Sequence, residues 1–134
     1  MSRPVKFGVY LPEELASELE ELSRNLGIKS KSRIVQEALR LFITEHRWRT
    51  RGSVCGAIGV LYNHEIKGVD EKLTDIQHKY LDVIIATVHV HLDPEKCMLL
   101  IVTRGSSDRV RDLVRDISGI RGVLLTRTVL LESE

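Results

Sequence analysis

Four side chains that could bind a metal lie within twenty positions of one another: His78, His89, His91 and Cys97. His89 and His91 are two positions apart in the segment 84–92, whose residue types predict a β-strand. Because successive side chains of a strand point to opposite faces, both imidazoles project from one face. Cys97 follows a short turn containing Asp93-Pro94, so we expect it to begin the next strand and to approach the pair. Imidazoles with one thiolate suit a late first-row metal such as nickel, copper or zinc.

Each of these residues also has an ordinary explanation. A single histidine on a strand is usually an exposed or hydrogen-bonded polar group, and a single cysteine usually behaves as a small buried hydrophobic residue. A His-x-His pair alone would therefore indicate a metal only weakly. The addition of Cys97 across a hairpin, and of His78, makes a metal site the favoured interpretation.

The position of His78 decides whether one chain can complete the site. The segment 69–82 predicts a helix with an apolar stripe, formed by Val69, Leu73, Ile76 and Tyr80. At about 100° per residue, His78 lies roughly opposite that stripe and should point away from its own sheet. The even positions of the strand, Ala86, Val88, Val90 and Leu92, predict the face that helices cover, which leaves the two histidines on the open face. We therefore expect a partner chain to supply His78, unless His78 is merely a solvated helix residue.

The second part of the chain alternates between strand and helix patterns. The expected elements are a strand at 53–62, a helix at 69–82, strands at 84–92 and 97–103, a helix at 106–117 and a strand at 122–131. This βαββαβ order predicts a ferredoxin-like domain of the kind that ACT-type regulatory domains also use.

The first part reads as one strand and two helices. Residues 6–11 alternate as a short half-buried strand, Pro12 fits the start of a helix, Gly27 fits its end, and Ser30 can cap a second helix. These elements cannot bury their apolar faces alone, and a lone strand has two unpaired edges. A symmetric dimer removes both problems, so we expect a ribbon-helix-helix domain over 1–50 and the ferredoxin-like domain over 51–134, an α+β chain overall.

A two-stranded ribbon has the size that enters the major groove of double-stranded DNA. Its outward positions here are Lys6, Gly8 and Tyr10. The start of the second helix, with Lys29, Ser30 and Lys31, should hold a phosphate of the DNA backbone. The segment 46–52 is a candidate linker; it is either a fraying helix end with solvated arginines or a second phosphate contact.

Composition agrees with a soluble regulator that has a basic head. Residues 1–52 hold ten Lys or Arg and seven Asp or Glu, whereas residues 53–134 hold ten and twelve. No apolar run reaches the length of a membrane span, and residues 1–6 lack the apolar core of a signal peptide. We therefore expect a cytoplasmic protein with no membrane contact, whose Cys55 and Cys97 stay reduced.

Taken together, these segments resemble the nickel-responsive transcriptional regulator family, NikR, over nearly the whole chain. The matching segments are 26–27 leading into 31–32, 61–65 (Leu-Tyr-Asn-His-Glu), 77–82 (Gln-His-Lys-Tyr-Leu-Asp), 87–91 (Thr-Val-His-Val-His) and Cys97. The resemblance implies a homotetramer, a dimer of dimers, that binds Ni(II) in a square-planar site and represses nickel-uptake genes when metal-loaded. It implies His89, His91 and Cys97 of one chain and His78 of another as the ligands.

The chain departs from the family pattern at two places. Many members carry an Arg and two Thr where this chain has Lys6, Gly8 and Tyr10, which implies a different operator sequence. The family also binds a potassium ion between its domains through two carboxylates, of which one matches Glu37 while the other falls on the cation Arg33. His64 matches a histidine suggested as an alternative ligand in some members, but an exposed turn histidine is the simpler interpretation.

Three functions remain for comparison. The leading one is a nickel-responsive DNA-binding repressor of transcription. The second is a metal-buffering or small-molecule-sensing ACT protein whose N-terminal domain mainly dimerises. The third is an enzyme with a catalytic metal, but catalytic zinc sites keep an open position and no general acid–base pair stands beside the cluster. We therefore expect no enzymatic activity.

Overall fold

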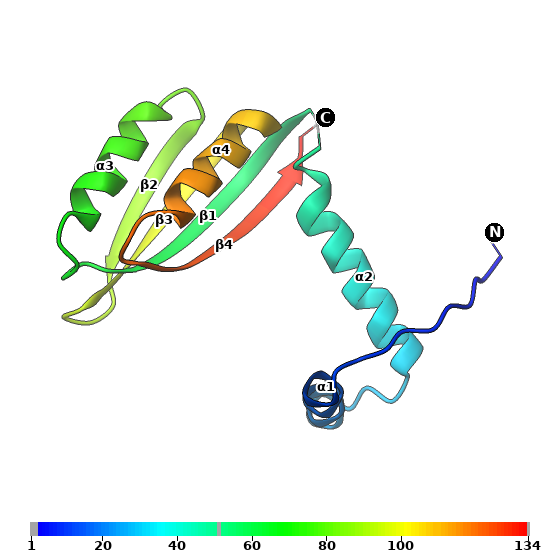
Figure 1. Cartoon of the computed structure of the whole chain (residues 1–134). Helices are drawn as coiled ribbons and strands as arrows, with labels where there is room; N and C mark the ends of the chain where they lie inside the picture. The colour runs from blue at the N-terminus through cyan, green and yellow to red at the C-terminus, as the bar shows by residue number, and fades with distance from the viewer. Residues whose placement is uncertain (1–2, 51, 134) are drawn as a thin grey trace. The chain divides into compact units, whose positions relative to one another are not determined.

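The computed structural model in Figure 1 describes residues 3–50 and 52–133. The chain forms two compact units, Met1–Leu39 and Arg40–Glu134. Among the described residues, no helix is both long enough and apolar enough to span a bilayer. The division into domains at 50 and 51 stays a prediction.

The first unit contains α1 (Glu13–Leu26) and the beginning of α2 (Lys31–Arg47). Pro12 precedes α1 instead of opening it, so the expected start was one residue early. Gly27 ends α1 in the left-handed conformation at φ 69°, which glycine adopts without a steric penalty. The Ser30 side chain caps α2, because its Oγ accepts a hydrogen bond from the Arg33 backbone N–H at 3.2 Å.

The expected strand over Lys6–Leu11 is not formed within the described single chain, so its pairing with a second copy stays a prediction. The segment lies exposed and without strand pairing; Phe7 is 69% and Val9 63% exposed. The physical reason is that a strand is defined by its hydrogen-bonded neighbour, and these residues have no neighbouring strand within the chain. The two helices also lack a partner that buries them within the chain, since neither has a fully buried residue.

The second unit is an antiparallel sheet of four strands in the order β2-β3-β1-β4. The strands are β1 (Ser53–Asn63), β2 (Ile84–His91), β3 (Lys96–Ser106) and β4 (Val123–Glu132). Figure 1 shows α3 (Val69–Lys79) and α4 (Ser107–Ser118) on the same side of the sheet, with the other side bare. The expected βαββαβ arrangement is therefore present.

The core of this unit lies between the sheet and its two helices. The sheet contributes the even positions of β1 and the odd positions of β3, and α4 contributes Val110, Leu113 and Ile117. Trp48, which directly follows α2, is also buried here at 1% exposure. Neither interpretation of 46–52, as a helix end with solvated arginines or as a phosphate contact, anticipated this burial of Trp48. Arg47 and Arg49 are exposed, as both interpretations require; Arg51 of that segment lies outside the described residues.

Candidate metal centre

The hairpin formed by β2 and β3 brings three of the expected ligands together. His91 and Cys97 are register partners across the hairpin, and His89 is two positions further along β2. One potential ligand atom from each of the three residues lies within 4.8 Å of the others. Cys97 Sγ is 3.4 Å from His91 Nδ1, and the two imidazole centroids are 4.7 Å apart. The hairpin thus presents two nitrogens and one sulfur to a common point.

The cluster lies on the face of the sheet that the helices cover, which corrects the sequence-based expectation. His89 pairs with Leu99 and His91 with Cys97, and both of these β3 residues are buried on the helix side. The even positions are on the bare face instead, where Val88 and Leu92 are about half exposed. Strand alternation separated the two faces of β2 correctly, but it could not say which face the helices cover, because the bare face is apolar as well.

Tyr62 contacts this cluster, although the sequence analysis gave it no role in the site. It is the register partner of Cys97 on β1, and its hydroxyl lies 2.9 Å from His89 Nε2. Burial is the main reason that the pKa of Tyr62 is raised well above its ordinary value, and the negative charges of Asp70 and Cys97 raise it further. A hydroxyl that stays protonated can fix the orientation of the His89 ring.

His78 does not join the cluster within its own chain. It is an exposed residue of the last turn of α3, opposite the buried Val69, Leu73 and Tyr80, as expected. Asp70, at the other end of α3, is the residue whose carboxylate acts on the Tyr62 hydroxyl. Eight residues of helix separate the two, which at 1.5 Å per residue is a rise of about 12 Å. The first turn of α3 is therefore near the cluster and His78 is not.

The loop between β2 and β3 is held by local hydrogen bonds. Asp93 Oδ1 accepts from the backbone N–H groups of Glu95 at 2.8 Å and Lys96 at 2.7 Å, which lowers the pKa of its carboxyl. His64 Nε2 contacts the carbonyl oxygen of Pro94. His64 lies in a turn, is half-buried rather than exposed, and is absent from the three-residue cluster.

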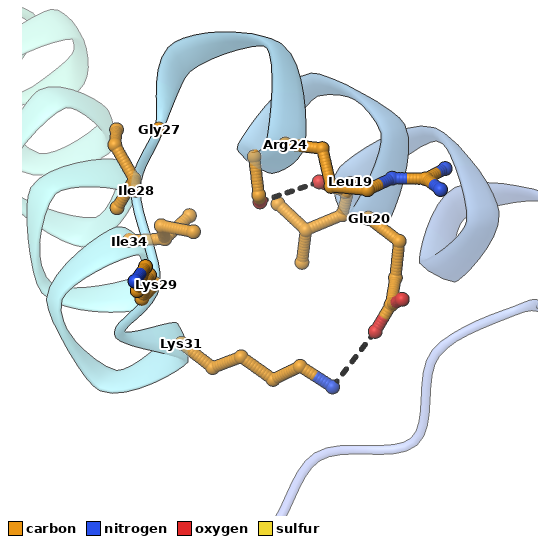
Figure 2. Close-up of a pocket in the computed structure, with 9 residues that line it drawn as sticks. Leu19, Glu20, Arg24, Gly27, Ile28, Lys29, Lys31 and Ile34 are labelled. Atoms are coloured by element: carbon orange, nitrogen blue, oxygen red, sulfur yellow. Dashed lines mark hydrogen bonds and ion pairs between the residues drawn. The ribbon is translucent and has the colours of Figure 1, made fainter.

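The expected DNA-binding residues belong to the first unit. Lys6, Gly8 and Tyr10 are exposed, and a Cβ built on Gly8 would meet no atom within 4 Å. Figure 2 shows Lys29 and Lys31 beside the turn that joins the two helices, where Lys31 Nζ forms an ion pair with Glu20 Oε1 at 3.0 Å. Its hydrogen bond is the first cause of the lowered pKa of Glu20. One lysine of the expected phosphate site is therefore already neutralised in part.

Comparison with known proteins identifies the family to which the chain is similar. Residues 55–131 match the family model described as the NikR C-terminal nickel-binding domain. The chain belongs to the NikR family. Residues 5–45 match the model for ribbon-helix-helix proteins of the copG family, which supports the N-terminal half of the assignment. The resemblance drawn from the sequence is therefore confirmed, and so is the combination of a ribbon-helix-helix region with an ACT-like domain.

Relatives in the NikR family match over nearly their whole length. A protein of Dictyoglomus thermophilum is 39% identical over 92% of this chain and 92% of its own, and one of Methanocaldococcus jannaschii is 37% identical over 92% and 89%. Both have curated names that contain the words nickel-responsive regulator. Regulators of this family are a non-enzymatic class, so the expectation of no enzymatic activity is confirmed.

A solved structure supports the fold alone. An uncharacterized protein of Thermotoga maritima superposes with a TM-score of 0.53 and 16% identity, covering 61% of this chain and 99% of its own. Because the match covers nearly all of that protein but only part of this chain, that protein corresponds to one domain and not to the whole NikR chain.

Arg33, where the family pattern led us to expect a second carboxylate, forms a local ion pair. Its Nε lies 3.1 Å from Glu37 Oε1, one helical turn further along α2, and both side chains are exposed. The carboxylate matched to the family's potassium site is therefore paired with a side-chain cation of its own helix.

Proposed function

We propose that this chain is a DNA-binding repressor that responds to Ni(II) and represses nickel-uptake genes when it is loaded with metal. The observation that carries the proposal is the convergence of His89, His91 and Cys97 in a member of the NikR family. The ribbon-helix-helix match over residues 5–45 supports the DNA-binding half.

The chemistry of the three donors fits nickel. Two imidazole nitrogens and one thiolate are ligands that late first-row divalent metals prefer over carboxylate and water. Cys97 is buried and Tyr62 lies at its register position, so the sulfur is shielded from solvent oxidants on the protein side. Nickel, when bound, would supply a positive charge that links the donors of the hairpin. Protons compete with it for imidazole and thiolate, so affinity should fall as the pH is lowered.

We assign the fourth ligand to His78 of a second chain. Within one chain His78 is exposed and stands at the opposite end of α3 from the residue that reaches Tyr62. The route that we expected, a partner packed against the open face, is no longer available for this purpose, because the cluster is on the helix-covered face. A second chain would have to approach at the edge where β2 ends the sheet.

Two exposed apolar surfaces support assembly into a homotetramer, a dimer of dimers. The first is the N-terminal segment with α1 and α2, in which no residue of either helix is fully buried. The second is the bare face of the sheet, whose half-exposed members are Val88, Leu92, Leu125, Val129 and Leu131. Patches of this kind on a chain usually mark contacts with another protein, and two self-complementary contacts generate a dimer of dimers.

For DNA, we propose that a ribbon formed by two N-terminal segments places Lys6, Gly8 and Tyr10 in the major groove. The open space around Gly8 allows close approach of the ribbon backbone to the bases. Lys29, Ser30 and Lys31, at the start of α2, would hold a backbone phosphate, where the N–H groups and the helix dipole favour an anion.

Nickel titration of the full chain tests the metal site. Binding should produce a thiolate charge-transfer band with one nickel per chain. Cys97→Ala should abolish the band and weaken binding, whereas Cys55→Ala, which alters the only other cysteine, should preserve both. Unchanged affinity and spectrum in Cys97→Ala would show that the assigned donor set is wrong.

Mixing of variants tests the shared site. His78→Ala and His89→Ala chains each lack one donor, so mixed oligomers should recover intact sites that neither variant has alone. If mixing restores no nickel binding, the four ligands do not come from two chains.

Footprinting on the DNA upstream of the chain's own gene tests the regulatory half. Nickel should be required for tight protection of two half-sites separated by whole helical turns. Lys6→Ala should reduce the preference for the operator over random DNA, whereas Lys31→Ala should weaken all DNA binding about equally. Equal operator affinity with and without nickel would favour the metal-buffering alternative instead.

A further inference from the structure

We propose that Arg109 is a positioning residue for nickel binding, because with Asp82 and Tyr80 it fixes the last turn of α3 and so holds His78 in place for the second chain. The inference rests on the proposed role of His78 as the fourth ligand. It concerns a set of contacts between α3 and α4 that is separate from the three-residue cluster on the hairpin.

Arg109 forms three hydrogen bonds, one with the end of α3 and two with the turn that follows it. Its Nε donates to Asp82 Oδ2 at 2.9 Å and its Nη2 donates to Asp82 Oδ1 at 2.7 Å, which is the two-pronged arrangement that guanidinium and carboxylate favour. The same Nη2 donates to the backbone carbonyl of Lys79 at 3.1 Å. Asp82 has a lowered pKa, of which the hydrogen bond from Arg109 is the first cause. The guanidinium thus links the terminal carbonyl of α3 to the turn that follows it.

Tyr80 holds the same turn from the side of the core. Its ring is 1% exposed, and the Arg109 guanidinium carbon lies 4.4 Å from the ring centroid. Its hydroxyl donates to Asp116 Oδ2 on α4 at 2.5 Å, and Lys79 Nζ donates to the same oxygen at 3.2 Å. Two consecutive residues at the end of α3 are therefore tied to α4.

This matters for His78 because it directly precedes those two residues. The last carbonyls of a helix have no partner within the helix, so the final turn frays unless other groups satisfy them. Among the hydrogen bonds of the described residues, none is made by the His78 side chain, so only the backbone of the last turn determines where the imidazole starts. A positive guanidinium at the C-terminal end of the helix dipole adds to the hold.

The test measures nickel affinity and spectrum of the full chain in two backgrounds. Arg109→Gln removes the charge and the fork but keeps a polar side chain, and Arg121→Gln is the matched control, an exposed arginine just after α4. We expect Arg109→Gln to weaken nickel binding about tenfold, the size seen when groups that orient a ligand are removed. Its spectrum should move toward that of His78→Ala while the Cys97 thiolate band remains. Arg121→Gln should change neither.

The decisive comparison is made in chains that already carry His78→Ala. If Arg109 acts through His78, Arg109→Gln should cause no further loss there, because the interaction that it supports is already gone. An equal loss in both backgrounds would show that Arg109 only supports the fold, and would overturn the proposal. Asp82→Asn, on the exposed side of the same contact, should reproduce the result and replaces Arg109→Gln if that variant fails to fold.

The outcome also separates this inference from the function beneath it. If His78→Ala weakens nickel binding and neither Arg109→Gln nor Asp82→Asn does, His78 is a ligand but Arg109 does not position it. If His78→Ala leaves affinity and spectrum unchanged, the proposed ligand set itself is wrong, and the positioning role falls with it.

Discussion

Replacement of Trp48 by alanine should destabilise the second unit by about 3 kcal/mol. A tryptophan buries roughly 200 Å², and at about 25 cal/mol per Å² of apolar surface this amounts to about 5 kcal/mol. A compact denatured state already hides part of that area, which reduces the value to roughly 3–4.5 kcal/mol. The buried indole N–H has no acceptor among the described residues. Its removal returns about 1 kcal/mol.

The assay is urea unfolding of the full chain followed by far-UV circular dichroism, because Trp48 is the only tryptophan and the variant has no indole fluorescence. Trp48→Phe should lose much less than Trp48→Ala, since it keeps an aromatic ring and removes the unpaired N–H. Arg49→Ala is the control from the same segment; its guanidinium lies 5.4 Å from the Trp48 ring. We expect that control to cost only about 0.5 kcal/mol. A Trp48→Ala free energy of unfolding within error of wild type would refute the burial of Trp48.

Three further predictions concern the support of the sheet and of α3. Thr103→Val should cost about 1 kcal/mol in urea unfolding, because the buried Thr103 hydroxyl donates to the Val83 carbonyl at 2.6 Å; a neutral result would show that the bond is not formed. Gly56→Ala should abolish the cooperative thermal unfolding of the sheet, since its Cβ would stand 1.9 Å from the Val129 carbonyl oxygen, whereas Gly8→Ala, with open space, should not. The pKa of Asp116 is lowered, chiefly by the Tyr80 hydroxyl. Its carboxylate therefore stabilises the fold above the unfolded pKa of about 3.9 and loses that effect as pH falls through the lower folded value. Asp116→Asn should lose less stability than wild type below pH about 4, and identical acid titrations would contradict this.

The fold of the second unit could be predicted from the sequence because its patterns are local. Alternation and turn residues located all four strands and both helices to within a few positions, and the βαββαβ order followed from them. The N-terminal strand could not be verified in one chain, since its hydrogen-bonding partner is a copy of itself. Trp48 was missed because no periodic pattern surrounds it: it directly follows the end of α2, and only the packing of the second unit reveals that it is buried.

The candidate site also has residues that local sequence predicts and residues that only the tertiary fold brings near. The proximity of His89, His91 and Cys97 could be predicted from the sequence, because a short hairpin fixes their register. Tyr62 lies 27 positions from His89 and Arg109 lies 27 positions from Asp82, so neither pair could be found without the strand order and the placement of α4. The error about which face of β2 the helices cover arose because the face opposite the histidines is apolar, although the helices leave it bare.

The place of β2 at the edge of the sheet limits how firmly two of the candidate ligands are held. β2 is hydrogen-bonded to β3 alone, so its free side has no neighbouring strand within the described chain. Edge elements open locally at a lower free energy than the whole domain. Each moment in which the end of β2 separates from β3 also separates His91 from Cys97, and the apparent affinity for a ligand falls in proportion to the fraction of chains that are competent to bind it. Amide hydrogen exchange along β2 would therefore report how much of the intrinsic affinity of the site the unliganded protein can express.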